Sequence, residues 1–217
     1  MRGTMAFITV FLSGFAIMVL EIIGARYLAR DFGSSFYVWV SQIGVVMMSL
    51  ALGYFVGGAL ADRIPRPALL AWFLIPTGIY IWFIPDLSPR IIDAIIMRHP
   101  VDESIPMLWR KLDPALGSAV IFLVPGFVLA LLGPFMIRFC AGRLDRVGSV
   151  SGFIYAASTV GSIAGVFVSG YVLIDHWGTT AIFRGTGVLG GLLGLMCLAM
   201  RGPCNVVSSH LSVAGSR

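Results

Sequence analysis

Long stretches without a charged residue are the feature that most constrains what this chain can fold into. Residues 36–60 and 151–174 contain no Asp, Glu, Lys or Arg, and each is long enough to cross a bilayer as a helix. The whole chain of 217 residues is 58% hydrophobic and 12% charged, whereas a soluble domain carries about a quarter of charged residues. The sequence therefore predicts an integral membrane protein.

Apolar runs of this kind recur from one end of the chain to the other. We expect an all-α integral membrane bundle of about six transmembrane helices, in residues 5–28, 36–60, 67–84, 115–137, 151–174 and 179–200. Pro76 is expected to break the third helix, because proline lacks the backbone N–H that a helix interior requires. Gly33 is expected to permit the chain reversal between the first two helices.

Two segments do not fit a membrane span. Residues 85–114 include apolar pairs and charges at helical spacing, which predicts an outer amphipathic segment on the membrane surface. Three of the carboxylates in this segment, Asp102, Glu103 and Asp113, are expected to form a solvated face rather than a catalytic cluster. Residues 201–217 are polar and rich in Ser, which predicts a disordered cytoplasmic tail.

The distribution of Arg predicts the orientation in the membrane. The net charge is +5, and loops on the cytoplasmic side of membrane proteins carry an excess of Lys and Arg. The short inner loops and the end of the sixth helix hold Arg63, Arg66, Arg138, Arg143, Arg146 and Arg201, whereas the short outer turns and adjoining helix ends hold Arg26, Arg30 and Arg184. We expect a multi-pass protein of a bacterial-type inner membrane with both termini in the cytoplasm. The basic residues then indicate a lipid bilayer as partner and no nucleic acid.

Glu21 lies within the first apolar run, several residues from either end. A charged group at mid-membrane costs about 2.5–3.5 kcal/mol on insertion scales, so it is expected to face the protein interior or a cavity. Arg26 is five positions away and on a different helical face, which makes Arg184 the candidate partner. Gln42 is a second polar group within a span. These four residues are the candidate substrate-binding or intramembrane charges; the alternative is that Glu21 lies near the outer interface and is hydrated.

Small residues at four-residue spacing predict close contacts between helices. Gly53 and Gly57 form one such pair, and Gly161 and Gly165 form another. Glycines at this spacing allow two helix backbones to approach closely in a membrane. We therefore expect these four glycines to lie in helix–helix interfaces.

The sequence also contains a weak internal repeat. A shift of 117 residues aligns Ser41 with Ser158, Gly44 with Gly161, Gly53 with Gly170 and Tyr54 with Tyr171. This shift pairs the second helix with the fifth and leaves three helices in each half. The pattern fits an inverted three-plus-three repeat, as in half of a major facilitator; the alternative is a chance alignment of glycine-rich helices.

The loop after the second helix carries a charge motif. Residues 58–66 read GALADRIPR and resemble the major facilitator signature G-x-L-A-D-R-x-G-R. The resemblance implies that Asp62, Arg63 and Arg66 belong to a charge network between helix ends on the cytoplasmic side. Pro65 replaces the usual Gly, which makes the turn stiffer than in the family. The alternative is an ordinary basic loop on the inner side.

Two longer blocks resemble the membrane part of the fused major facilitator/spermidine synthase family. They cover residues 14–63 and 148–179, and they include LE-x-x-G-x-R, FGSS-x-YVW and STVGSIAG. In that family a soluble domain follows the membrane unit and transfers an aminopropyl group to putrescine. We expect no such domain within these 217 residues, because no glycine-rich strand–helix turn is evident. The resemblance therefore implies an identity for the membrane unit but does not extend the synthase activity to it.

Three functions can be weighed from these features. The first is a membrane module that anchors or serves a separate polyamine aminopropyltransferase-like enzyme, as the resemblance implies, and this one is slightly favoured. The second is a half-size transporter of a small cationic solute that acts as a dimer, as Glu21 and the repeat suggest. The third, an enzyme active within the membrane, is disfavoured because no paired carboxylates, no His/Cys cluster and no nucleophile with a base are evident. No catalytic residue, metal site or cofactor is expected.

Overall fold

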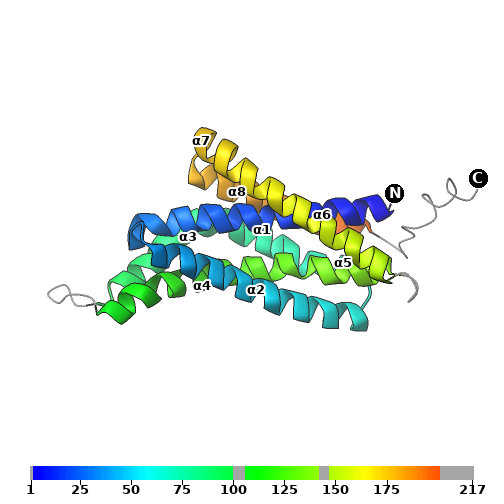
Figure 1. Cartoon of the computed structure of the whole chain (residues 1–217), viewed down its shortest axis with the longest axis horizontal. Helices are drawn as coiled ribbons and strands as arrows, with labels where there is room; N and C mark the ends of the chain where they lie inside the picture. Colours follow the sequence, from blue (N-terminus) through cyan, green and yellow to red (C-terminus); the bar gives the residue numbers. More distant parts are fainter. Residues whose placement is uncertain (1, 100–105, 142–146, 201–217) are drawn as a thin grey trace, which may run out of the picture.

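The computed structural model describes residues 2–99, 106–141 and 147–200, and they form a bundle of long helices (Figure 1). The helices are α1 (Arg2–Phe32), α2 (Phe36–Arg63), α3 (Ala68–Ile96), α4 (Met107–Ala130), α5 (Leu132–Cys140), α6 (Val147–Val168), α7 (Ile174–His176) and α8 (Thr179–Ala199). A π-helical segment, Ser169–Leu173, joins α6 to α7.

Among the described residues, six helical stretches are long and apolar enough to cross a membrane, which confirms the predicted fold class. In chain order, the first three spans are α1, α2 and α3. The fourth combines α4 with α5, the fifth combines α6, the π-helical segment and α7, and the sixth is α8. The chain is thus a multi-pass membrane protein whose environment is a lipid bilayer. The end of the bundle at which α1 begins is called the N-terminal end. The other end is called the opposite end.

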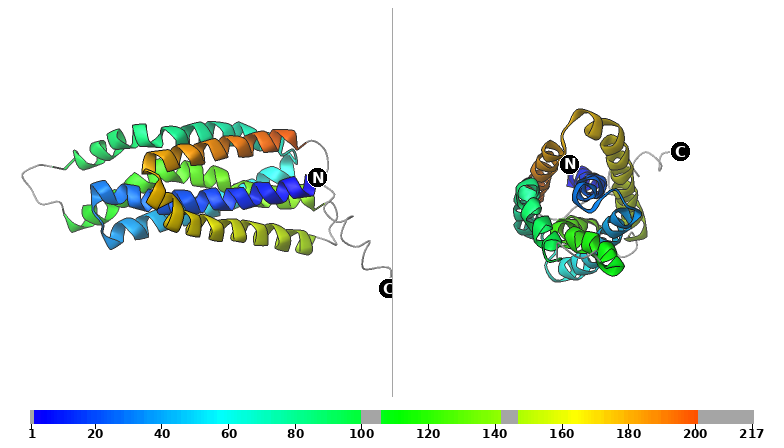
Figure 2. Two further views of the ribbon diagram at one scale, coloured as in Figure 1. Left: turned by 90° about the horizontal axis from the view of Figure 1, so that it is seen from above. Right: turned by 90° about the vertical axis from the view of Figure 1, so that its left-hand side faces the viewer.

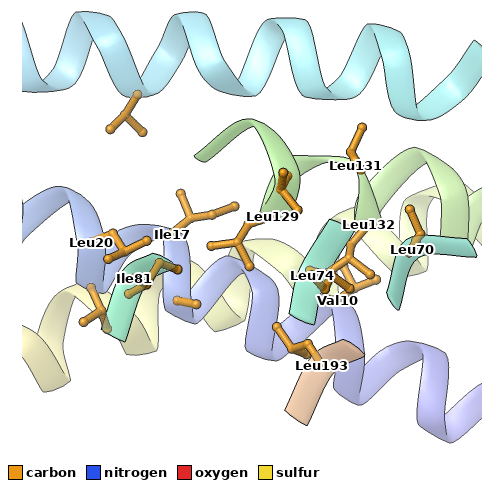
Figure 3. Close-up of a cluster of buried hydrophobic side chains, with 14 of the residues drawn as sticks. Val10, Ile17, Leu20, Leu70, Leu74, Ile81, Leu129, Leu131, Leu132 and Leu193 are labelled. Carbon is orange, nitrogen blue, oxygen red and sulfur yellow. The ribbon is translucent and has the colours of Figure 1, made fainter. Parts of the chain in front are cut away.

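Helix α1 lies in the middle of the bundle. Viewed along the long axis it lies inside the other helices, and it contacts α2, α4, α5, α6 and α8 (Figure 2). Its side chains contribute Val10, Ile17 and Leu20 to the apolar core, where they meet Leu74 of α3 and Leu129 of α4 (Figure 3). In contrast, α2 and α6 bury the smallest share of their residues inside the bundle.

Glycines lie in the three most extensive helix pairs, which are α3 with α8, α1 with α6 and α2 with α4. A β-carbon on Gly53 would lie 2.5 Å from the carbonyl oxygen of Phe127, and one on Gly165 would lie 2.6 Å from that of Phe15. A β-carbon on Gly78 of α3 would lie 2.7 Å from the carbonyl oxygen of Gly187. Only glycine lets these backbones approach so closely.

The helix pairs follow the predicted repeat, but the residue alignment does not. In a three-plus-three repeat, α1 corresponds to the span of α4 and α5, and α2 corresponds to α6. If α1 contacts α6, the repeat therefore requires that α4 contacts α2. Both contacts are observed. However, the shift of 117 residues pairs buried Gly161 with Gly44, which has nothing within 4 Å of its β-carbon position. It also pairs buried Gly53 with Gly170, which is equally open. The structural counterparts of Gly53 and Gly57 are Gly161 and Gly165. The first pair contacts the span of α4 and α5, and the second pair contacts α1, which is the corresponding span of the other half.

The expected outer segment 85–114 is wrong as a separate element. Helix α3 continues through Pro76, Pro85 and Pro89 to Ile96, and α4 begins at Met107. Packing sustains α3 beyond its prolines, because its buried positions recur at helical spacing as far as Ser88 and Ile92. The expected tail 201–217 lies outside the described residues.

Irregular backbone occurs at two other places. Gly33 has a positive φ of 83° in the turn between α1 and α2, which is the conformation expected for this reversal. The fifth span, predicted as one regular helix over 151–174, instead contains the π-helical segment that begins at Ser169.

Candidate functional site

Glu21 lies on a part of α1 that no other helix covers fully. Phe11 and Phe15 contact α6, whereas the Ser13 hydroxyl donates a hydrogen bond of 2.8 Å to the carbonyl oxygen of Leu129 in α4. With about 100° of rotation per residue, Glu21 falls between these two contact faces, on the side of α1 flanked by α2 and α6. We call this side the Glu21 face. The side chain there is half-buried.

The Glu21 carboxylate makes no hydrogen bond and no ion pair with any other described residue. The expected pair with Arg184 is wrong, because Arg184 lies 3.6 Å from Asp86 of α3 and 5.6 Å from the ring centroid of Trp82. The geometry of α1 explains this difference. Tyr27 is the residue that faces α8, through Phe183, and Glu21 lies about 120° around the helix from it.

Arg26 is exposed and does not reach Glu21. It lines a small cavity of about 190 Å³ with Arg30, Trp177 and Thr179 at the opposite end of the bundle. Arg30 donates a hydrogen bond of 2.8 Å to the Thr179 hydroxyl. Arg26 therefore belongs to the interfacial end of α1 and not to the intramembrane site that contains Glu21.

Gln42 is fully buried between α1 and α4. Its Oε1 accepts a hydrogen bond of 2.6 Å from the Ser118 hydroxyl, whereas its Nε2 has no partner among the described residues. A β-carbon on Gly24 would lie 2.5 Å from that Nε2, so α1 closes over the amide. Gln42 thus joins three helices in the core and is not exposed to a solute.

A cluster that no pattern in the sequence indicated lies at the opposite end. Asp113 was expected on a solvated face, but it is buried, paired with Arg98 and 2.8 Å from Nε2 of His99. The Arg98 guanidinium lies over the Trp109 ring at 4.3 Å. The cluster borders a cavity of about 340 Å³, and these contacts hold the end of α3 to the start of α4. Asp102 and Glu103 lie outside the described residues.

The charge motif of residues 58–66 lies at the N-terminal end. The Arg138 side chain of α5 donates a hydrogen bond of 3.0 Å to Asp62, and both side chains are more than half exposed. Arg63 and Arg66 are exposed, and neither forms an ion pair within the described ranges. The motif thus contributes one bridge between α2 and α5, and Arg138 is its basic partner.

Most of these charges are thus either paired or exposed at the ends of the bundle. Among the residues that the structure describes, no three His, Cys, Asp or Glu side chains are grouped as metal ligands. Glu21 differs from the other carboxylates because it lies within a span, half-buried and without a partner. Chemically, such a group can bind a cation or exchange a proton.

Comparisons of the chain with known protein families, with curated proteins and with solved structures found no match.

Proposed function

We propose that this chain is a half-size membrane transporter that works as a pair of copies, with Glu21 as the group that meets a small cationic solute. The single observation that carries the proposal is the unpaired carboxylate of Glu21 within a membrane span. Ionisable residues inside membrane proteins are costly, and they commonly mark solute or proton pathways.

Pairing of two copies would enclose the Glu21 face. The flanking helices α2 and α6 leave most of their surface uncovered and carry large exposed apolar side chains, such as Phe55 and Phe167. A carboxylate on a lipid-facing surface is unfavourable, whereas one between two bundles can line a shared path. A second copy placed over α2 and α6 would therefore supply the missing wall.

We base the proposed orientation on the Arg residues of the short loop after α2 and of the end of α5. Arg63, Arg66 and Arg138 all lie at the N-terminal end, which we place at the cytoplasmic side of a bacterial-type inner membrane. Glu21 then lies in the half of α1 that is nearer to the outer side.

Uptake by proteoliposomes tests the role of Glu21. Labelled spermidine uptake would be measured for the wild type, for Glu21→Gln and for Asp86→Asn as a control that removes an exposed, paired carboxylate. Loss of a charge-assisted contact costs about 1.5–3 kcal/mol, which corresponds to a roughly ten- to hundredfold weaker uptake for Glu21→Gln. Equal uptake by the wild type and Glu21→Gln, at any rate above empty vesicles, would contradict the proposal. A proton flux that depends on Glu21, without spermidine uptake, would show that the transported species is a proton and not a cationic solute.

The second candidate is a membrane module that anchors a separate aminopropyltransferase-like enzyme. The observation that favours it is the resemblance of residues 14–63 and 148–179 to the membrane part of the fused synthase family. Purification of the tagged chain from native membranes in a mild detergent, with mass and protein identity measured together, tests this function. A stoichiometric synthase-like protein would support it, and a homodimer without that protein would favour transport.

A further inference from the structure

Ser169, like Glu21, is a polar side chain within a span that makes no hydrogen bond with the other described residues. Its side chain is fully buried, and its hydroxyl oxygen makes no hydrogen bond in the described part of the chain. A buried hydroxyl without a partner costs about 1–3 kcal/mol, so its presence requires an explanation. Ser169 is also the first residue of the π-helical segment.

The register of α1 and α6 places Ser169 beside Glu21. The two helices run in the same direction, because Phe11 contacts Gly161 and Phe15 contacts Gly165, four residues further along each helix. In the same interface the Ser162 hydroxyl donates a hydrogen bond of 3.4 Å to the carbonyl oxygen of Gly14.

Seven residues, or two helical turns, separate Gly14 from Glu21 and Ser162 from Ser169. A step of seven residues returns each helix to nearly the same face, with a drift of about 20°. Helix α6 remains α-helical as far as Val168, so this count holds up to Ser169. The two unpartnered groups therefore lie at the same level on packed helices, without a hydrogen bond between them.

The π-helical segment supplies an independent sign of function at this level. Here the Ile174 N–H donates to the carbonyl oxygen of Ser169, five residues earlier, instead of four. Such wider turns are rare, and they occur frequently at functional sites. In transporters, irregular helical backbone within a span commonly surrounds a coupling ion.

We propose that the Glu21 carboxylate and the Ser169 hydroxyl are two oxygen ligands of a monovalent alkali cation, with Na⁺ as the probe. This inference deepens the proposed transport function and rests on it for its biological role. Carboxylate and hydroxyl oxygens suit hard cations, whereas soft transition metals prefer sulfur and imidazole. One carboxylate balances one positive charge, whereas Ca²⁺ sites typically draw on several carboxylates.

Binding of Na⁺ to the purified chain tests the site without any transport assay. Binding of ²²Na⁺ would be measured in mild detergent, with unlabelled NaCl or choline chloride as competitor at equal ionic strength. The variants are Glu21→Gln, Ser169→Ala and Ser162→Ala, the last being a matched control that removes a serine already bonded to Gly14. We expect saturable binding to the wild type and to Ser162→Ala. Glu21→Gln should abolish it, and Ser169→Ala should weaken it by about tenfold or more, as loss of a supporting ligand does.

Two further variants keep the test decisive if one of these fails to fold. Glu21→Asp retains the carboxylate, and Ser169→Cys preserves the packing but replaces the hydroxyl oxygen by sulfur. Bound Na⁺ should persist in Glu21→Asp with weaker affinity, and Ser169→Cys should weaken binding by about tenfold or more, as Ser169→Ala does. Equal binding of ²²Na⁺, insensitive to choline, in the wild type, Glu21→Gln and Ser169→Cys would overturn the proposal. Absence of saturable ²²Na⁺ binding to the wild type would overturn it as well.

The two proposals fail in different ways. Saturable Na⁺ binding that depends on Glu21 and Ser169, together with no solute flux in proteoliposomes, would support the cation site and contradict the transport function. Solute uptake that depends on Glu21 but is unchanged when choline replaces Na⁺, with no ²²Na⁺ bound, would support transport and overturn the cation site.

Discussion

Substitution of Gly161 by Ala tests whether close backbone contact holds α1 and α6 together. The added β-carbon would overlap the Phe11 carbonyl oxygen, which is backbone and cannot rotate away. Overpacking of this kind costs about 1–3 kcal/mol, and the better helix propensity of Ala returns about 0.5–1 kcal/mol. The expected result is a net loss of about 1–2 kcal/mol in the free energy of unfolding.

Gly44 provides the matched control on α2. The repeat in the sequence aligns it with Gly161, but its β-carbon position has nothing within 4 Å. Gly44→Ala should therefore leave stability unchanged or raise it by about 0.5–1 kcal/mol, through helix propensity alone.

Thermal unfolding in a mild detergent, followed by circular dichroism, compares the two variants. A loss of 1–2 kcal/mol corresponds to a decrease in Tm of roughly 2–8 °C for a chain of this length. If Gly161→Ala unfolds at the same temperature as Gly44→Ala, the close contact of α1 with α6 does not hold these helices together and the interface argument fails.

Two other predictions concern buried polar groups. Asp113→Asn should lower the free energy of unfolding by about 2–4 kcal/mol, because it leaves Arg98 without its buried partner; Asp86→Asn, at an exposed pair, should cost less than about 1 kcal/mol. Equal shifts in denaturant unfolding would show that burial of Asp113 adds nothing. Ser118→Ala should lower the free energy of unfolding by about 1–3 kcal/mol, because Oε1 of Gln42 then lacks its hydrogen-bond donor. Ser34→Ala, in an exposed turn, is the control and should change it by no more than about 0.5 kcal/mol. A Ser118→Ala variant as stable as Ser34→Ala would contradict that account.

The sequence alone predicted six spans and the intramembrane position of Glu21, because both depend on local composition. An apolar run of about 20 residues needs no tertiary contact to mark a helix in a bilayer. The glycines at four-residue spacing likewise indicated close packing, because this spacing places them on one face of a single helix. The lengths of the third and fourth spans were missed, because continuation of α3 past three prolines depends on its contacts with neighbouring helices.

The candidate site was predicted only in part. Glu21 was identified from its place in the sequence, but its neighbours were not, because they belong to helices far apart in the chain. No local pattern indicates that Asp113 pairs with Arg98, or that Asp62 meets Arg138. Ser169 carried no signal in the sequence beyond being one small residue among several on its helix.

The sequence by itself therefore determined that the chain is a membrane bundle with a carboxylate, Glu21, within its first apolar run. Only the tertiary structure decided what surrounds that carboxylate. The physical reason is that composition sets the free energy of transfer into the bilayer one helix at a time, whereas partner choice depends on rotation and register between helices. A rotation of about 120° around α1 separates Glu21 from the face that meets α8, and a two-turn step along α1 and α6 places it beside Ser169.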